Sequence, residues 1–287
     1  MSSPLFTIIT ATYNAAATLP RLLESLAEQT CRDFELIIQD GASKDDTVAV
    51  AESYRDRLPF LSLASEPDAG IYDAWNKALP RVRGQWVLFL GADDELAGPQ
   101  VLESAKKILK MFPDSVLFGA GDMILVDTEG IVHKTIIVDC NKAFERLSRV
   151  FGMPLAHPAL FTRQKVVIGN AFDATYKISG DYDFLCRTWK NPNEARELHV
   201  LVTRMSLGGV SSSPTTEKLM RTESRRCARK HFPLRWNNCY RYAFLMAESY
   251  LHGTKMRLRE ILKSCFIGRK IWIFLQTWRK NVIDQGH

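Results

Sequence analysis

Apolar residues in the first 95 positions gather into four short runs. They occupy residues 5–11, 34–39, 60–64 and 86–90, and each run contains β-branched or aromatic side chains. A short apolar run without strict alternation is typical of a strand covered on both faces, as in a parallel sheet. We therefore predict four strands in this part of the chain.

Segments with helical spacing separate these runs. Leucines at positions 19, 22, 23 and 26 recur at the interval of an amphipathic helix, with Thr18 as its expected N-cap and Pro20 in its first turn. Further helices are expected after residues 40 and 68 and over residues 100–111, and residues 116–138 predict a hairpin with its turn at 127–130. This alternation indicates the α/β class, with a mostly parallel central sheet flanked by helices.

Polar residues follow each of the four predicted strands. Taken singly, each is more often a turn residue or a helix cap than a ligand contact. In open α/β sheets, however, ligands bind beyond the carboxyl ends of the strands, so the joint placement of these residues predicts a binding site. They are Thr10, Thr12 and Asn14 after the first strand, Asp40 and Asp45 after the second, Asp68 and Asn76 after the third, and Asp93 and Asp94 after the fourth.

The turn after residue 90 carries the clearest candidate chemistry. Gly91 and Ala92 end the apolar run, and two carboxylates, Asp93 and Asp94, follow at once. Mg²⁺ is commonly held by one or two carboxylates together with substrate phosphates. The alternative is that one of these acids caps the next helix. Neither a P-loop nor a G-x-G-x-x-G motif follows the first strand, which argues against a P-loop NTPase or a dinucleotide-binding domain.

Composition is that of an ordinary globular protein, with 46% hydrophobic and 24% charged residues among 287. The six cysteines show no metal-ligand spacing, and we interpret them as reduced thiols of a cytoplasmic protein. The sequence shows no signal-peptide pattern and no apolar run of about 18 residues, the length that a membrane-spanning helix needs.

Charge is unevenly distributed. Residues 214–287 hold 16 Lys and Arg against 5 Asp and Glu, a net +11, whereas the preceding 213 residues hold 22 against 27, a net −5. Residues 265–280 place Trp, Phe and Ile between basic pairs, which suits a helix lying in a membrane interface. The alternative is a helix that packs on the body and has a solvated basic face. No base-reading motif supports a nucleic-acid partner.

Four segments together resemble glycosyltransferase family 2, which has the GT-A fold. They occur in the order and at the spacing of that family: IITATYN (8–14), QDGASKDDT (39–47), DAGIYDAWNK (68–77) and FLGADD (89–94). The resemblance implies a GT-A domain over residues 1–213, with a nucleotide-binding half (1–95) and an acceptor half (96–213). Residues 214–287 would form a helical, basic tail.

The resemblance also implies roles on the donor side. Asp40 would accept a hydrogen bond from the base, and Asp93 would ligate Mg²⁺ or Mn²⁺ with Asp94 beside it. Gly91 departs from the pattern, since many members carry an acid there, and this leaves fewer carboxylates for the metal. The remaining residues expected around the nucleotide-sugar are Thr10, Ala11, Thr12, Asn14, Asp68 and Asn76.

On the acceptor side, the resemblance places the catalytic base at Asp181, where it would take the proton of the acceptor hydroxyl. Gly180 stands where the family usually has Glu. Asp183 and His157 are also expected near the acceptor. The structural alternatives are that both acids favour the first turn of a helix through its dipole, and that His157 is a core residue.

These features predict a metal-dependent, inverting glycosyltransferase that uses a nucleotide-sugar, commonly a UDP-sugar in this family. The acceptor would be a saccharide, or a saccharide on a polyprenyl-diphosphate lipid, in polysaccharide assembly at the cytoplasmic face of the cell membrane. Two alternatives stay open. One is a non-catalytic nucleotide-sugar-binding subunit, and the other is a nucleotidyltransferase-like enzyme.

Overall fold

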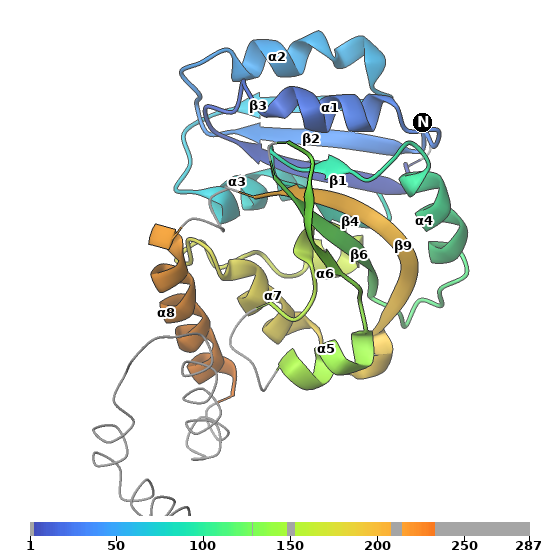
Figure 1. The fold of residues 1–287 in the computed structure, drawn as a ribbon, viewed down its shortest axis with the longest axis vertical. Helices are drawn as coiled ribbons and strands as arrows, with labels where there is room; N and C mark the ends of the chain where they lie inside the picture. The colour runs from blue at the N-terminus through green and yellow to red at the C-terminus, as the bar shows by residue number, and fades with distance from the viewer. Residues whose placement is uncertain (1–2, 128, 148–152, 208–213, 233–287) are drawn as a thin grey trace, which may run out of the picture. The chain divides into compact units, whose positions relative to one another are not determined.

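The computed structural model describes residues 3–127, 129–147, 153–207 and 214–232. Within them, nine strands form one sheet in the order β3-β2-β1-β4-β8-β6-β9-β5, and β7 pairs with β6 (Figure 1). The strands are β1 (Phe6–Thr12), β2 (Phe34–Asp40), β3 (Leu61–Ser65), β4 (Trp86–Phe89), β5 (Glu95–Leu96), β6 (Phe118–Val126), β7 (Val132–Ile136), β8 (Leu160–Arg163) and β9 (Ala195–Ser206). The helices are α1 (Leu19–Ala27), α2 (Thr47–Ser53), α3 (Ile71–Ala78), α4 (Val101–Leu109), α5 (Cys140–Leu147), α6 (Gln164–Ile168), α7 (Gly180–Thr188) and α8 (Pro214–His231).

The first half of the sheet is parallel, as predicted. β1 pairs in parallel with β2 and β4, and β2 pairs in parallel with β3. The register aligns Thr12 with Asp40 and Asp40 with Ser65, so the carboxyl ends of β1, β2 and β3 meet at one edge. Helices α1 and α2 lie on one face of these strands and α3 on the other (Figure 1). Covered faces explain why the strand sequences are apolar without alternation.

The second half departs from the prediction of a mostly parallel sheet. β8 is antiparallel to both β4 and β6, β5 is antiparallel to β9, and only β6 and β9 run parallel. The complete sheet is therefore mixed. The predicted hairpin is confirmed, since β6 and β7 pair antiparallel on either side of the turn.

The main core lies between α1 and the strands. The four leucines of the predicted helix, at positions 19, 22, 23 and 26, are fully buried, and Pro20 stands in the first turn. They belong to one cluster with Ile8, Leu36 and Ile38. Burial of each such side chain stabilises the fold by about 1.5–3 kcal/mol.

The domain boundary that the sequence predicts before residue 214 stays a prediction. The chain divides into two compact units, residues 1–227 and 228–287. Hence the first 14 residues of the basic segment, 214–227, belong with the sheet domain. Among the described helices, none is long and apolar enough to cross a membrane. The helix predicted at a membrane interface, residues 265–280, lies outside the described residues.

Candidate active site

The carboxylate of Asp40, the last residue of β2, joins the ends of three strands. Oδ1 accepts hydrogen bonds from the hydroxyls of Thr12 (2.9 Å) and Ser43 (2.5 Å), and Oδ2 accepts from Ser43 N–H (2.9 Å) and the Ser65 hydroxyl (2.6 Å). Burial raises the pKa of Asp40, but these bonds outweigh it and hold the pKa below its usual value. Four bonds fill the acceptor sites of a carboxylate. Asp40 thus fixes the floor of the site, and its contact with a base stays a prediction.

The turns that follow β1 and β2 are hydrogen-bonded to each other. The Asn14 N–H donates to Ser43 Oγ at 2.8 Å, and Asn14 Oδ1 accepts from the Lys44 N–H at 2.8 Å. Asp45 accepts from the Ala16 N–H at 3.1 Å. Asn14 has a φ of 49°, a left-handed conformation that asparagine adopts more readily than most residues. The two turns therefore form one rim beside the carboxyl ends of the strands.

Thr10 and Ala11 lie on β1, just before this rim. The Thr10 hydroxyl is buried and has no hydrogen-bond partner among the described residues. Ala11 is partly exposed and aligns with Gln39 of β2. Both residues are therefore close to the strand ends at which the nucleotide is expected, and their contact with it stays a prediction.

Asp68 and Asn76, on either side of the start of α3, have different surroundings. Asp68 Oδ1 accepts from the Gly70 N–H at 2.8 Å, and its carboxylate lies against Gly41 in the turn after β2. Asn76 instead uses both polar atoms of its amide on the backbone of Phe172, at 2.8 and 2.9 Å. Asn76 thus tethers α3 to the segment before α7, and its contact with a nucleotide-sugar stays a prediction.

Asp93 and Asp94 follow β4 in a tight turn over Gly91. Asp94 Oδ2 accepts from the Gly91 N–H at 2.9 Å, and Asp94 is only 3% exposed. A Cβ at position 91 would lie 2.8 Å from Asp93 Oδ1 and 2.9 Å from Asp94 Oδ2, so the two carboxylates fill the space that a side chain would need. Helix α4 begins at Val101 with Gln100 as its N-cap, so neither acid caps the next helix.

The donor set of this turn fits a divalent ion. Burial and the neighbouring charge of Asp93 raise the pKa of Asp94 to about 7. Asp93 is partly exposed, and the hydrogen bonds found at it in the described part of the chain use its backbone carbonyl. Two adjacent carboxylates of this kind favour a cation, and carboxylate oxygens are the ligands that Mg²⁺ and Mn²⁺ prefer.

Two distant residues hold this turn in place. Arg21 of α1 donates from one Nη to the Asp93 carbonyl and to the Ser206 hydroxyl, and Ser206 at the end of β9 donates to the same carbonyl at 2.8 Å. Sequence reasoning missed both residues. They stand 72 and 113 positions away from Asp93, and neither belongs to a motif.

Asp181 lies in the first turn of α7, on the side that faces α3. Its Oδ1 accepts from the Tyr182 N–H at 2.8 Å and lies 3.4 Å from the Tyr72 hydroxyl, which donates to the Ile178 carbonyl at 2.5 Å. Burial raises the pKa of Asp181 to about 6, although these hydrogen bonds oppose the rise. Such a carboxylate is ionised at neutral pH and is a stronger base than an ordinary aspartate.

Packing explains the glycine before Asp181. A Cβ at Gly180 would lie 2.7–2.8 Å from three carbons of the Tyr72 ring, and that ring is buried and held by its hydroxyl. Tyr72 therefore occupies the space that the family's usual Glu would need. The loss of that acid has a local steric reason, and by itself it does not indicate a lost active site.

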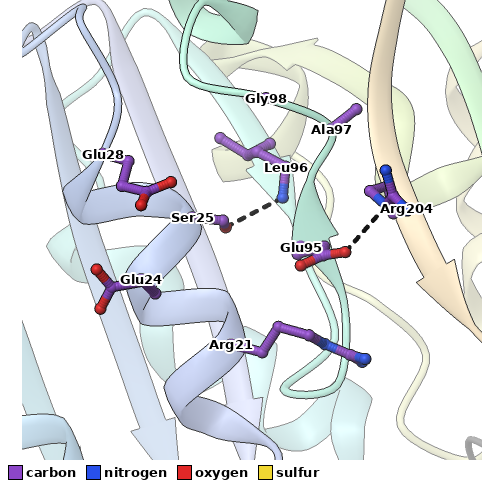
Figure 2. Close-up of a pocket in the computed structure, with 9 residues that line it drawn as sticks. All are labelled: Arg21, Glu24, Ser25, Glu28, Glu95, Leu96, Ala97, Gly98 and Arg204. Carbon is purple, nitrogen blue, oxygen red and sulfur yellow. Dashed lines mark hydrogen bonds and ion pairs between the residues drawn. The ribbon is translucent and has the colours of Figure 1, made fainter. Parts of the chain in front are cut away.

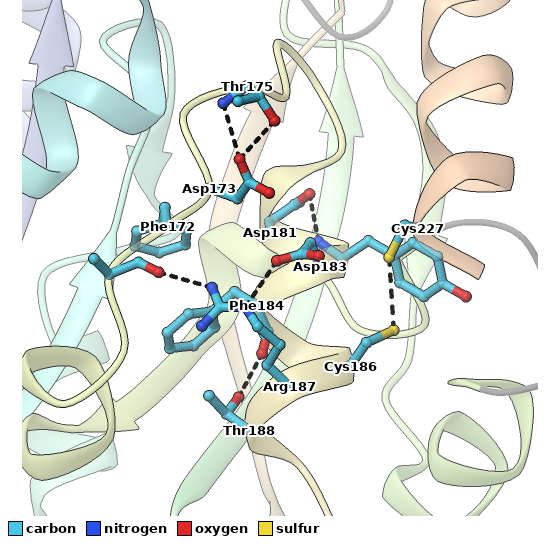
Figure 3. A network of polar contacts seen from close by, with 12 residues as sticks. Phe172, Asp173, Thr175, Asp181, Asp183, Phe184, Cys186, Arg187, Thr188 and Cys227 are labelled. Atoms are coloured by element: carbon cyan, nitrogen blue, oxygen red, sulfur yellow. Dashed lines mark hydrogen bonds and ion pairs between the residues drawn. The ribbon is translucent and has the colours of Figure 1, made fainter. Parts of the chain in front are cut away.

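Asp183 and His157, both predicted near the acceptor, are buried. Asp183 is 0% exposed and forms an ion pair with Arg187 at 2.8 Å (Figure 3). His157 stacks on Trp75 and Phe89 at centroid distances of 5.2 and 5.4 Å, and burial lowers its pKa to about 4. Burial of both side chains favours the structural alternatives, and their contact with an acceptor stays a prediction.

An aromatic cluster connects the Asp93 turn with the start of α7. In α3, Trp75 packs on Phe89 of β4 at 4.6 Å, while Phe172 stacks on Phe184 of α7 at 4.7 Å. Phe89 and Phe172 also meet edge to face at 5.2 Å, so the cluster connects the end of β4 with α7. Sequence reasoning used the DAGIYDAWNK motif without assigning this role to its aromatic residues, whose helical spacing was the available signal. The cluster consists of Tyr72, Trp75, Phe89, His157, Phe172 and Phe184.

A cavity of about 370 Å³ opens on the α1 side of the Asp93 turn, between α1, β5 and β9 (Figure 2). Arg21 is the residue that it shares with the support of the turn. Most charged side chains that line the cavity form ion pairs: Glu95 pairs with Arg204 at 3.0 Å, and Glu24 pairs with Arg57 at 2.6 Å. None of the predicted site residues lines it, so we do not assign it to the donor.

The mixed sheet and its flanking helices have the architecture of a GT-A fold. Residues 7–169 match the family described as Glycosyl transferase family 2, and the chain belongs to this family. The chain is 33% identical to a PGL/p-HBAD biosynthesis glycosyltransferase of Mycobacterium bovis over 227 residues, which are 77% of this chain and 84% of that one.

Solved structures share the fold at low sequence identity. Staphylococcus aureus TarS 1–349 matches with a TM-score of 0.60 and 21% identity, over 80% of this chain and 65% of that one. Its complex with UDP-GlcNAc matches with a TM-score of 0.61 and 18% identity, over 90% of this chain and 78% of that one. Glucosyl-3-phosphoglycerate synthase of Mycobacterium tuberculosis was solved with Mn²⁺, UDP and glucosyl-3-phosphoglycerate. It matches with a TM-score of 0.53 and 15% identity, over 79% of this chain and 80% of that one.

Proposed function

We propose that this glycosyltransferase is a metal-dependent, inverting enzyme that transfers a sugar from a UDP-linked donor to a saccharide acceptor. The observation that carries the proposal is Asp181, a partly exposed carboxylate with a pKa of about 6 in the first turn of α7, a helix that the aromatic cluster connects to the strand before the Asp93 turn. Structural neighbours solved with UDP-GlcNAc, or with UDP and Mn²⁺, support the choice of donor and ion.

In the proposed reaction, the oxygen of the acceptor hydroxyl attacks the anomeric carbon of the donor sugar, and its proton passes to Asp181. The bond between the anomeric carbon and the diphosphate oxygen breaks as the new glycosidic bond forms. UDP leaves, and the configuration at the anomeric carbon inverts. A divalent ion held by Asp93 would stabilise the charge that develops on the leaving diphosphate.

The acceptor that we propose is a growing saccharide, free or linked to a polyprenyl diphosphate, in polysaccharide assembly. The net charge of +11 on residues 214–287 supports a location of the enzyme next to an anionic surface, such as the cytoplasmic face of a cell membrane. Exposed basic residues on the described part of α8, Arg221 and Arg225, belong to this charge.

Thermal shift with UDP-, GDP- and dTDP-sugars in the presence of Mn²⁺ tests the donor. A bound ligand raises the melting temperature by mass action, so we expect the largest rise with a UDP-sugar. Hydrolysis of that donor is then compared between the wild-type chain and Asp181→Asn. Binding with no hydrolysis or transfer by either chain would indicate a non-catalytic subunit, and pyrophosphate release from a nucleoside triphosphate would indicate a nucleotidyltransferase.

A further inference from the structure

One carboxylate of α8 binds the backbone that leads into α7. Glu223 Oε1 accepts from the Lys177 N–H at 2.8 Å, and Oε2 accepts from the N–H groups of Ile178 at 2.9 Å and Ser179 at 3.0 Å. Glu223 is only 6% exposed. Three consecutive amide groups are thus satisfied by a residue that lies more than 40 positions further along the chain.

The same short segment is held on its other sides as well. The Ile178 carbonyl accepts from the Tyr72 hydroxyl of α3 at 2.5 Å, so this residue is bound through its N–H by α8 and through its carbonyl by α3. The Ser179 hydroxyl lies 3.1 Å from the Ser224 hydroxyl and donates to the Met220 carbonyl at 3.3 Å. The backbone of residues 177–179 is therefore held by hydrogen bonds to both α3 and α8.

The supported segment immediately precedes the proposed base. Ser179 is the N-cap of α7, and Asp181 follows two residues later in the first turn. Because a helix start is rigid, the positions of residues 177–179 set the direction of the Asp181 side chain. Two titratable groups face Asp181: the Glu223 carboxylate from α8 and the Tyr72 hydroxyl from α3.

We propose that Glu223 is a positioning residue for the transfer reaction, holding the start of α7 so that the Asp181 carboxylate faces the acceptor hydroxyl. The inference rests on the proposed function, which makes Asp181 the base. It gives Glu223, within the basic segment that the sequence predicted as a tail, a supporting role for the proposed base. The opposite face of the same helix keeps its basic residues exposed, among them Lys218, Arg221 and Arg225.

The test is Glu223→Gln in the full-length chain. A glutamine keeps the shape but places an NH₂ group against N–H donors, so the segment loses part of its support. We expect kcat of sugar transfer to fall by up to about 100-fold, the effect of misplacing a reacting group by about 1 Å. The KM for the donor and the Kd for UDP should stay at the wild-type values. Removal of the negative charge should also move the acid limb of kcat/KM to lower pH.

The matched control is Glu217→Gln on the exposed face of α8, where Glu217 pairs with Arg221 at 2.6 Å, and it should leave every parameter unchanged. Glu223→Asp keeps the charge on a shorter side chain, so we expect a lowered kcat with the acid limb at its wild-type position. If Glu223→Gln does not fold, Glu223→Asp alone tests the proposal, and a wild-type kcat of Glu223→Asp would overturn it.

Two further results would overturn it. One is a folded Glu223→Gln chain with wild-type kcat and acid limb. The other is an equal loss of UDP affinity and kcat with an unmoved acid limb, which would mean general loosening of the fold. A wild-type chain that transfers no sugar from any donor contradicts the proposed function itself, so the two failures are distinguishable.

Discussion

At the scale of single residues, two aspartates on one helical turn have opposite environments. Asp181 is partly exposed, touches the Tyr72 hydroxyl, and has a pKa of about 6 because burial disfavours its charged form. Asp183 is fully buried and paired with Arg187. A base must both reach the substrate and accept a proton, so only Asp181 is suited to that role.

Replacement of Asp181 by Asn should lower kcat of transfer by about 10²–10⁴-fold, the usual contribution of a general base. In the wild-type chain, kcat/KM should fall as the pH drops through about 6, because the base is protonated below that pH. Initial rates between pH 5 and 8 check both. Asp183→Asn is not a suitable control, because it breaks a buried ion pair. The control is Asp46→Asn, at an exposed position, which should have the wild-type rate. A wild-type rate for Asp181→Asn would contradict the assignment.

Gly180 and Tyr72 should be energetically coupled. Gly180→Ala places a methyl group within 2.8 Å of the Tyr72 ring, and overpacking of this kind costs about 1–3 kcal/mol. Tyr72→Leu removes the ring, so the double variant should lose less stability than the two single variants together. Urea unfolding of all four chains measures the coupling, with Gly98→Ala as control, since a Cβ at Gly98 meets nothing within 4 Å. Strict additivity would show that the contact is not tight.

At the scale of elements, the site depends on strand ends tied to each other. Asp40 bonds Thr12 at the end of β1 and Ser65 at the end of β3, and it also binds the turn that holds Ser43. Its lowered pKa reflects these bonds, which outweigh burial. The rim around the predicted nucleotide pocket therefore depends on one carboxylate.

Asp40→Asn should destabilise the domain by about 2–4 kcal/mol, because its amide group faces donors and leaves buried polar groups unpaired. Asp46→Asn is the matched control, since this nearby residue is exposed and its side chain makes no capping bond to α2. Urea unfolding gives the difference in the free energy of unfolding. Equal stability of the two variants would contradict the role of Asp40 as a junction of strands.

The turn after β4 gives a prediction that runs against the family pattern. Gly91→Asp restores the acid that many members carry, yet its side chain would meet the carboxylates of Asp93 and Asp94 within 3 Å. We expect weaker Mn²⁺ binding and lower activity than in the wild-type chain. Titration calorimetry with Mn²⁺ and UDP measures this, with Gly98→Asp as the control at an open position. Tighter Mn²⁺ binding by Gly91→Asp would show that the turn readily rearranges.

At the scale of the whole molecule, charge divides the chain differently from packing. The positive charge begins near residue 214, whereas the compact unit that contains the site extends to Cys227. Cys227 lies 3.9 Å from Cys186 of α7, sulfur to sulfur (Figure 3). Between Lys218 and Cys227, α8 thus combines an inner face that supports α7 with an outer basic face.

Binding of the full-length chain to lipid vesicles should depend on charge. Each basic residue near an anionic surface contributes about 1 kcal/mol at low ionic strength, and salt screens the attraction. We expect co-sedimentation with vesicles that contain phosphatidylglycerol, loss of binding as salt rises, and no binding to neutral phosphatidylcholine vesicles. Equal binding to both lipids, insensitive to salt, would contradict an electrostatic membrane contact.

The sequence by itself determined the α/β class, the first four strands, the hairpin and the strand-end polar residues, because these depend on local periodicity and on turn residues. It also carried the motifs of the family. It could not show that the second half of the sheet is mixed, since strand direction there depends on pairing between distant segments.

Only the tertiary structure decided what the individual polar residues do. Asn76 reaches Phe172 across 96 positions, and Glu223 reaches Lys177 across 46. Desolvation, which raises the pKa of Asp181, likewise comes from neighbours that the fold assembles. Periodicity reports on neighbours within a few residues, whereas hydrogen bonding and burial depend on what the folded chain places around each group.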